Sequence, residues 1–328
     1  MIFGEVALDH AEGAILAHSI ALSKGGRIRK GKMLTATDIA LLRTSDIHAV
    51  IVARLQEGDV HEDAAAARIG AALCGAGLRA NVASTGRVNL YAEAAGVVDI
   101  DRDAVDAVNA IDPMITIATV GEWQRVREGG MVATVKIISY AVADKLVVVA
   151  EEAARNALRL RGLARRRVSL IETGGAISPR AAEAIGGRLA RMGAELSAHV
   201  ATVHECDAIA RAFAEASGDL ILLLTETATS DPADVGPEGL RRAGGTVTRF
   251  GMPVDPGNLL FFGDLKGKPV IGLPGCARSP ALNGADWILE RMLCGVPIPT
   301  DSVARMGVGG LLKEIPERRA PREAPERE

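Results

Sequence analysis

The C-terminal half of the chain alternates apolar runs with amphipathic stretches. Six apolar runs are typical of strands: residues 168–173, 195–202, 219–225, 246–251, 258–263 and 268–273. Between them, apolar residues recur at helical spacing, which predicts helices over residues 178–193, 207–217, 237–244 and 281–295. Ser178 is expected to cap the first of these helices. Strands that alternate with helices are typical of a doubly wound, mostly parallel sheet covered on both faces. The pattern therefore predicts an α/β fold for this half.

The N-terminal half shows no regular alternation of this kind. Gly25 and Gly26 mark a turn, and Thr37 is placed to cap a short helix over residues 38–43. The remaining predictions are a strand over residues 48–55, helices over 62–78 and 104–111, a loop entering another helix over 84–96, and strands over 114–120 and 129–142. We therefore expect a mixed α+β region here.

A change in composition separates the two halves. Residues 155–167 form a basic run with helical spacing, and we place a domain boundary near Arg165. The last sixteen residues carry five bases, five acids and three prolines with almost nothing to bury, which is typical of disorder. The expected organisation is a hairpin and helix region over residues 1–60, a mixed α+β domain over 61–165, an α/β binding domain over 166–300, and a disordered charged tail over 301–328.

Composition narrows the class of protein. The formal charge of −3 over 328 residues argues against a protein that neutralises many nucleic-acid phosphates. The four cysteines lie far apart and suggest neither a disulfide framework nor a zinc site. No apolar run approaches the roughly 20 residues that span a bilayer, and the N-terminus lacks a basic leader. We therefore expect a soluble cytoplasmic protein that binds neither nucleic acid nor membrane.

Candidate chemistry lies where the predicted strands end, because open α/β sheets bind ligands beyond the carboxyl ends of their strands. This rule selects four loops, at residues 172–178, 225–234, 251–258 and 272–280. All four are rich in Gly, Pro, Ser, Thr and Asp. Such loops offer backbone N–H groups and hydroxyls to a polar, anionic ligand. Together they predict a binding site at one edge of the sheet.

Two acids in the second loop are candidate metal ligands. Mg²⁺ is held by one or two carboxylates together with ligand phosphate and water, and Asp231 and Asp234 are suited to this role. The alternative is that Asp234 only caps the helix that begins at Pro237, and that Asp231 is a loop acid. Glu172 likewise has an ordinary interpretation as an acid at a strand end.

Three other features favour structural or surface roles. The glycine-rich stretch over residues 186–193 lies inside an amphipathic helix, so it is not a phosphate loop. His199 and His204, five residues apart, are expected to point to opposite faces of a strand and belong to no complete ligand set, so they are interpreted as structural histidines. A basic cluster at a hairpin tip is either solvated or helps to hold an anionic ligand: Lys24, Arg27, Arg29, Lys30 and Lys32.

The order of these motifs resembles the molybdopterin-binding domain shared by the MogA/MoaB proteins and the molybdopterin molybdotransferases of the MoeA and gephyrin type. The stretch "TETATSDPADVGPEGL" is similar to that family's segment of Gly-Gly, Ser, Gly-Asp-x-Asp and Pro-Glu. "GMPVDPGN" is similar to its Lys-Pro-Gly-Lys-Pro loop, and "GLPGCARSP" to its Leu-Pro-Gly-Asn-Pro loop. The N-terminal half resembles a divergent branch in which a cytidylyltransferase domain often follows.

The resemblance implies a MogA/MoaB-like fold, a pterin ligand and a homodimer. It assigns the contacts with molybdopterin or the molybdenum cofactor to these residues: Thr173, Gly174, Gly175, Thr225, Glu226, Thr227, Thr229, Asp255, Pro256, Gly257, Asn258, Pro274, Gly275, Cys276, Arg278 and Ser279. Asp234, with Asp231, would hold Mg²⁺ or orient molybdate, and Arg278 would neutralise phosphate charge. In this reading Cys276 contacts or packs and is not a nucleophile.

The sequence also departs from the family pattern. Gly175 and Ala176 stand where the molybdotransferases have two acids, Glu226 and Thr227 stand in place of Gly-Gly, and Pro232 replaces the first Asp of Gly-Asp-x-Asp. In the third loop, Asp255 and Asn258 replace both lysines. The order of the loops that form the pocket is therefore retained, whereas the family's charged residues in these loops are replaced by other residues.

Two functions follow from this pattern. One is a role in molybdenum-cofactor biosynthesis that includes molybdenum insertion, with a molybdotransferase-like transferase activity. The other is a non-catalytic carrier or adaptor that hands the cofactor to a cytidylyltransferase or a molybdoenzyme. A third interpretation, a plain nucleotide-binding domain, lacks a phosphate fingerprint.

Overall fold

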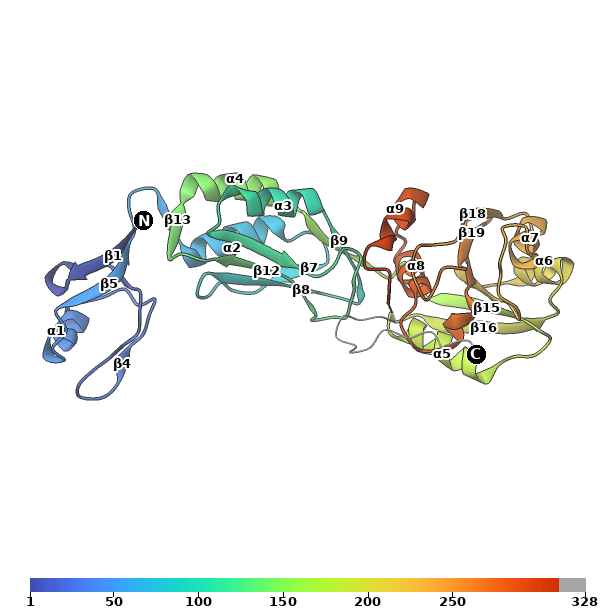
Figure 1. Cartoon of the computed structure of the whole chain (residues 1–328), viewed down its shortest axis with the longest axis horizontal. Coiled ribbons are helices and arrows are strands. Elements are labelled where there is room, and N and C mark those ends of the chain that lie inside the picture. The colour runs from blue at the N-terminus through green and yellow to red at the C-terminus, as the bar shows by residue number, and fades with distance from the viewer. Residues whose placement is uncertain (313–328) are drawn as a thin grey trace, which may run out of the picture. The chain divides into compact units, whose positions relative to one another are not determined.

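The computed structural model describes residues 1–312 of the chain. These residues divide into two compact units (Figure 1). Unit 1 comprises residues 1–94 and 98–160, and unit 2 comprises residues 95–97 and those from Arg161 onward. No helix within residues 1–312 is long and apolar enough to cross a membrane.

Unit 1 is mixed α and β, as the pattern predicts. Its helices are α1 (Ala36–Thr44), α2 (Glu62–Leu73), α3 (Arg102–Ile111) and α4 (Asp144–Ala154). Its strands, of which β9 and β14 extend into unit 2, are β1 (Ile2–Ala7), β2 (Ile15–Leu16), β3 (Ile20–Ala21), β4 (Arg27–Ile28), β5 (Ala49–Arg54), β6 (Asp59–His61), β7 (Leu78–Ala80), β8 (Arg87–Ala92), β9 (Gly96–Ile100), β10 (Ile115–Thr119), β11 (Arg125–Val126), β12 (Met131–Ile137), β13 (Ala141–Ala143) and β14 (Leu158–Gly162).

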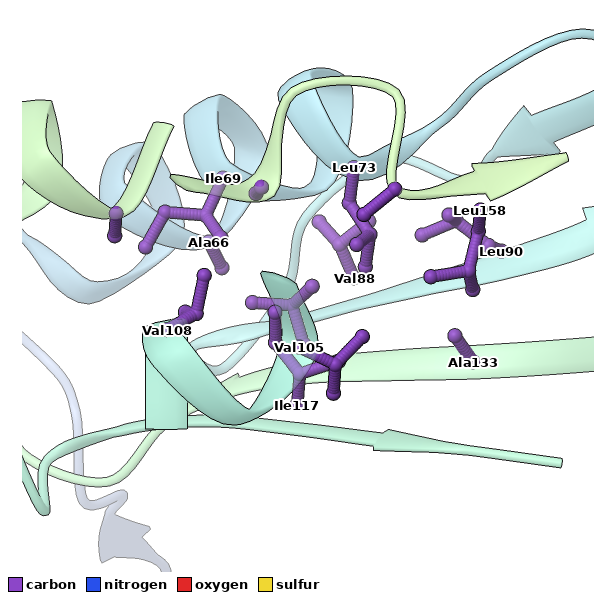
Figure 2. Close-up of a cluster of buried hydrophobic side chains, with 14 of the residues drawn as sticks. Ala66, Ile69, Leu73, Val88, Leu90, Val105, Val108, Ile117, Ala133 and Leu158 are labelled. Atoms are coloured by element: carbon purple, nitrogen blue, oxygen red, sulfur yellow. The ribbon is translucent and has the colours of Figure 1, made fainter. Parts of the chain in front are cut away.

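Unit 1 contains two separate apolar clusters. One is formed by residues between Leu8 and Val52, including the face of α1 that carries Ile39 and Leu42. The other lies between α2, α3, α4 and the antiparallel sheet β10-β12-β8-β7, and Figure 2 shows part of it. The division of this unit into residues 1–60 and 61–165 remains a prediction.

Three local predictions in unit 1 are wrong. The stretch over residues 84–96 is not a loop entering a helix: it contains β8, whose residues alternate between exposed and buried as a half-buried strand requires. The basic run over residues 155–167 is not helical, because β14 occupies its centre. Helix α1 is capped by Thr35 and not by Thr37: the Thr35 side chain accepts the N–H of Asp38, and the Asp38 carboxylate accepts the N–H of Thr35.

Unit 2 is an α/β domain with a mostly parallel sheet, as predicted. Its strands are β15 (Arg167–Thr173), β16 (Glu195–Thr202), β17 (Leu220–Leu224), β18 (Thr246–Phe250), β19 (Phe261–Leu265) and β20 (Lys268–Leu273). Its helices are α5 (Pro179–Ala190), α6 (Cys206–Glu215), α7 (Val235–Arg242), α8 (Gly284–Leu293) and α9 (Thr300–Ala304), with short 3₁₀ turns η2 (Gly275–Arg278) and η3 (Arg305–Gly307). The remaining 3₁₀ turn, η1 (Leu8–His10), belongs to unit 1.

The sheet of unit 2 has the strand order β16-β15-β17-β20-β19-β18. β16, β15, β17 and β20 are parallel neighbours, and β19 is antiparallel to both β20 and β18. All five residues of β17 are fully buried, as expected for a strand covered on both faces. Ile171, Ile221 and Leu223 lie on the face that packs against α6 and α7.

Part of the predicted tail is ordered. Within residues 301–312, Val303 and Met306 are buried, and the backbone of Asp255 pairs with that of Gly310 and Leu312. These contacts fasten the segment to the loop before Gly257. The rest of the predicted tail, residues 313–328, lies outside the described residues.

Close packing in the sheet yields a test with an internal control. A Cβ at Gly272 would lie 1.9 Å from the ring of its cross-strand neighbour Phe261, so Gly272→Ala should destabilise the protein by roughly 1–3 kcal/mol. Gly187, on the exposed side of α5, has open space around it, so Gly187→Ala should stabilise by about 0.5–1 kcal/mol. Urea unfolding measures both, and equal effects of the same sign would contradict this packing.

Candidate functional site

The candidate site lies at one edge of the unit 2 sheet. β15, β16, β17 and β20 are parallel, and the two antiparallel steps through β19 leave β18 parallel to β20. The carboxyl ends of these five strands therefore share an edge. The four loops selected from the sequence follow β15, β17, β18 and β20, so they all begin at this edge.

Hydrogen bonds join the first and second loops. The hydroxyl oxygen of Thr173, at the end of β15, accepts the backbone N–H of Glu226 at 2.7 Å. Within the second loop, the Thr225 hydroxyl donates to the carbonyl oxygen of Thr227 at 2.7 Å and lies 3.3 Å from the hydroxyl of Thr229. Thr173, Thr225 and Thr229 are buried, whereas Glu226 and Thr227 are exposed. The exposed pair is therefore within reach of a ligand, while the buried threonines hold the loop in place.

The turn after β15 depends on glycine. Gly174 and Gly175 both have left-handed backbone angles, and their N–H groups both donate to the carbonyl oxygen of Thr202 at 3.0 Å. A Cβ on Gly174 would lie 3.3–3.4 Å from side-chain carbons of Glu226. Ser178 then caps α5, as the sequence predicts, with its hydroxyl oxygen accepting the N–H of Ala181.

The fourth loop contributes a cation. After Pro274, residues 275–278 form η2, and Arg278 donates from its guanidinium to the carbonyl oxygen of Thr225 at 2.9 Å. The same guanidinium lies 3.9 Å from the carboxylate of Glu172, and about a third of the side chain is exposed. Arg278 therefore joins the fourth loop to the first and second, with part of its surface open to an anion.

Glu172 is a buried acid with three neighbours. Its carboxylate accepts the N–H of Ser178 at 2.9 Å, lies 3.1 Å from the imidazole of His199, and faces Arg278 as described above. A buried carboxylate with these contacts is satisfied. Glu172 and His199 thus hold the base of the first loop together, in agreement with their ordinary interpretations as a strand-end acid and a structural histidine.

His204 differs from the prediction. β16 ends at Thr202, so His204 lies beyond the strand, where strand alternation does not apply. Its Nδ1 is 2.9 Å from the hydroxyl of Thr173, and its Nε2 is 3.2 Å from the hydroxyl of Thr227. The sequence does carry a signal for this position. His204 follows the parallel strand β16 by two residues, and β16 ends at the same edge of the sheet as the strands that precede the four loops.

The third loop is linked to the site through the start of α8. Pro256 and Gly257 are buried, and a Cβ on Gly257 would lie 2.8 Å from the backbone nitrogen of Gly284. The adjacent Asn283 donates from its side-chain amide to the sulfur of Cys276 at 2.9 Å. Asp255 and Asn258 are exposed, and their side chains make no hydrogen bond or ion pair with the other loops within residues 1–312.

The second-loop acids have local hydrogen bonds. Asp234 caps α7: its carboxylate accepts the N–H groups of Val235 and Ser230 at 2.7 and 3.0 Å. Asp231 accepts the N–H of Ala233 at 2.7 Å. In the part of the chain that the structure describes, no group of three or more His, Cys, Asp or Glu side chains could hold a metal ion. Any metal here would therefore depend on oxygens from a ligand and water.

A buried arginine supports the fourth loop from behind. Arg188, on α5, donates to the carboxylate of Asp286 at 2.7 Å, and both side chains are at most 3% exposed. Its remaining N–H groups donate to the carbonyl oxygens of Ala184, Ala277, Ser279 and Ala281 at 2.6–3.2 Å. The predicted ligand contact Ser279 is therefore held through its backbone, and its hydroxyl oxygen accepts the N–H of Ala281.

A hollow of about 230 Å³ lies away from this edge, on the sheet beside α6. Small and apolar residues such as Ile171, Val200 and Ala212 line much of it. Ser169, Thr202, Ser217 and Arg211 add polar groups to its lining, but none of the four strand-end loops contributes to it. The loop edge therefore remains the better candidate for a polar ligand.

Removing the Arg188 guanidinium should weaken the fold. Arg188→Met removes the close buried partner of the Asp286 carboxylate and should lower the free energy of unfolding by roughly 3–5 kcal/mol. Arg191 lies 3.9 Å from the same carboxylate, but its side chain is 40% exposed, so Arg191→Met should cost less than about 1 kcal/mol. Urea denaturation compares the two variants, and similar losses would contradict the role assigned to Arg188.

The cysteines should differ in reactivity, because the thiolate is the reactive form. Burial raises the pKa of the Cys294 thiol to about 11, whereas the Cys276 thiol is only half-buried in the fourth loop. Iodoacetamide at pH 7.5 should therefore modify Cys276 well before Cys294, as measured by peptide mass spectrometry. In urea both should react alike, and early labelling of Cys294 in the native protein would refute the assignment.

Comparisons with known proteins give weak likenesses. A family described as a domain of unknown function (DUF8806) matches residues 5–54, and no curated protein matches the chain. A molybdopterin biosynthesis moea protein from Pyrococcus horikosii is similar, at 13% identity and a TM-score of 0.28 over 94% of this chain and 77% of that one. A molybdenum cofactor biosynthesis protein from Pyrococcus furiosus is similar at 13% identity and a TM-score of 0.24, over 95% and 64% of the two chains.

A third solved structure, NadC from Streptococcus pyogenes, has 16% identity and a TM-score of 0.17 over 43% of this chain and 59% of that one. At these scores the structures superpose poorly. The likenesses therefore establish no function for this chain.

Proposed function

We propose that unit 2 binds an anionic pterin of the molybdopterin type, and that the protein takes part in molybdenum-cofactor biosynthesis. The observation that supports this most is the joining of the first, second and fourth loops by Thr173, Thr225 and Arg278 at the carboxyl edge of the sheet. This is the edge at which open α/β sheets bind ligands. The motif order described from the sequence supplies the chemical class of the ligand.

The residues present suit such a ligand. Arg278 offers charge-assisted hydrogen bonds to a phosphate, and the exposed hydroxyl of Thr227 offers a neutral contact. Glycines 174, 175 and 257 let the backbone approach closely, and Cys276 and Ser279 lie on the same loop as Arg278. Asp255 and Asn258, from the third loop, would meet the polar ring of the pterin.

Two versions of this function differ in what Asp231 and Asp234 do. In the transferase version, both carboxylates hold Mg²⁺ together with ligand phosphate and water, and they orient molybdate. In the carrier version, they only shape the second loop, and the pterin passes to a cofactor-assembly partner or a molybdoenzyme. The bonds from both carboxylates to backbone N–H groups of their own loop favour the carrier. A homodimer is part of the proposal in either version.

Calorimetry with purified molybdopterin tests the binding proposal. We expect binding well below the millimolar range, and a loss of about tenfold or more in Arg278→Gln, because a charge-assisted hydrogen bond is worth about 1.5–3 kcal/mol. Arg211→Gln, on the exposed side of α6, is the matched control and should bind as the wild type does. Absence of binding below the millimolar range would rule the proposal out.

Molybdate insertion in vitro separates the two versions. If wild type inserts molybdate and Asp234→Asn, which keeps the shape of the helix cap, does not, the transferase version holds. If neither protein inserts molybdate while both bind the pterin, the carrier version holds.

A further inference from the structure

His204 lies between two hydroxyl groups at the loop edge. Its ring is half-buried, with Nδ1 facing the buried hydroxyl of Thr173 at 2.9 Å and Nε2 facing the exposed hydroxyl of Thr227 at 3.2 Å. Thr173 in turn accepts the backbone N–H of Glu226. The three side chains therefore form a continuous hydrogen-bonded chain from the end of β15 to the surface of the second loop.

The chain has two possible arrangements of its protons. A neutral imidazole has one N–H donor and one nitrogen acceptor, and a threonine hydroxyl can donate one bond and accept two. In one arrangement Nδ1–H donates to Thr173, and Nε2 accepts the O–H of Thr227. In the other, the O–H of Thr173 donates to Nδ1, and Nε2–H donates to Thr227, whose own O–H is then free for a ligand. Both pair the two imidazole nitrogens, but the first leaves the O–H of the buried Thr173 without an acceptor among the described residues, so the tautomer with a free Nε2 costs more than the other.

We propose that His204 exchanges a proton with a bound oxyanion through the hydroxyl of Thr227, and that Thr173 positions the ring for this exchange. The class of ligand is a phosphate monoester. When its monoanion binds, the P–OH gives its proton to the oxygen of Thr227, and the proton of Thr227 passes to Nε2. An imidazolium and a phosphate dianion result, and no bond to phosphorus breaks.

The ionisation ranges of the two partners support this exchange. A free imidazole ordinarily has a pKa of about 6.5, and the second pKa of a phosphate monoester is about 6. Because these two pKa values are close, the shared proton can lie on either the imidazole or the phosphate. A carboxylate in place of His204 would already be ionised and would repel the dianion.

Charged groups from several elements lie near His204 in the chain or at the loop edge. Glu226 lies on the loop after β17, Glu205 and Asp207 lie at the start of α6, and Asp207 is paired with Arg242. Arg278, on the fourth loop, favours the phosphate dianion. His199 has no comparable role, because its Nε2 faces the buried carboxylate of Glu172.

Nuclear magnetic resonance of the whole chain with labelled histidines tests the proposal, with inorganic phosphate as the probe. His204→Gln identifies the resonance of His204. We expect phosphate to raise the midpoint of the His204 titration by about half a pH unit or more, as a nearby negative charge does. Thr227→Val should abolish this rise and Thr227→Ser should keep it, while the exposed His48 of unit 1 serves as an internal control.

Three outcomes would overturn the proposal: a midpoint that phosphate does not move, a rise that persists in Thr227→Val, or an equal rise at His48. A purely structural histidine would show the first. The inference rests on the loop edge proposed above as the pterin site, but inorganic phosphate replaces the pterin as the probe. The phosphate titration can therefore be interpreted even if molybdopterin does not bind. The molybdopterin calorimetry can likewise be interpreted even if phosphate does not change the His204 titration.

Discussion

The guanidinium of Arg188 is the contact on which the loop edge of unit 2 depends. Arginine has five N–H donors and no acceptor, and a buried arginine with any of them unpaired is costly. Arg188 is 3% exposed, and its five donors meet five acceptors: the carboxylate of Asp286 and four backbone carbonyl oxygens. Three of these carbonyls belong to residues 277, 279 and 281. A helix side chain thereby sets the path of the whole fourth loop.

The same network reaches the third loop. Asp286 accepts Arg188 with one carboxylate oxygen and the backbone N–H of Asn283 with the other, which completes the capping box of α8. Asn283 then donates to the sulfur of Cys276, and its neighbour Gly284 packs on Gly257. Two loops that are distant in sequence are therefore held by one buried ion pair. The surface groups that a ligand could contact are therefore positioned by buried groups that would not contact the ligand.

Periodicity predicted the strands and helices of unit 2 well, because each element there has a long apolar run or a clear amphipathic face. The caps at Ser178 and Asp234 were also open to prediction, since a capping residue and its N–H partners lie within one turn. Unit 1 was harder. In residues 87–92 the alternation of exposed and buried positions is short, and the preceding Ser-Thr-Gly resembles the start of a loop.

The loops that form the candidate site could be predicted from the sequence, but the contacts between their residues could not. The strand-end rule selected the loops, yet the partners of Arg188 lie roughly ninety residues away in the chain, and no local pattern marks an arginine that will be buried. His204 was misplaced for a different reason. Its five-residue spacing from His199 is informative only if the strand continues, and β16 ends at Thr202.

The exchange of charged groups in these loops changes what kind of site this edge can be. Acids and lysines carry fixed charges near neutral pH, so a site built from them holds its ligand and metal in one ionisation state. At this edge hydroxyls, one imidazole and one guanidinium lie together, and the two second-loop carboxylates accept N–H groups of nearby backbone. The proton exchange proposed for His204 would let the charge of such a site change. That property suits a protein that must both take up and release an anionic ligand.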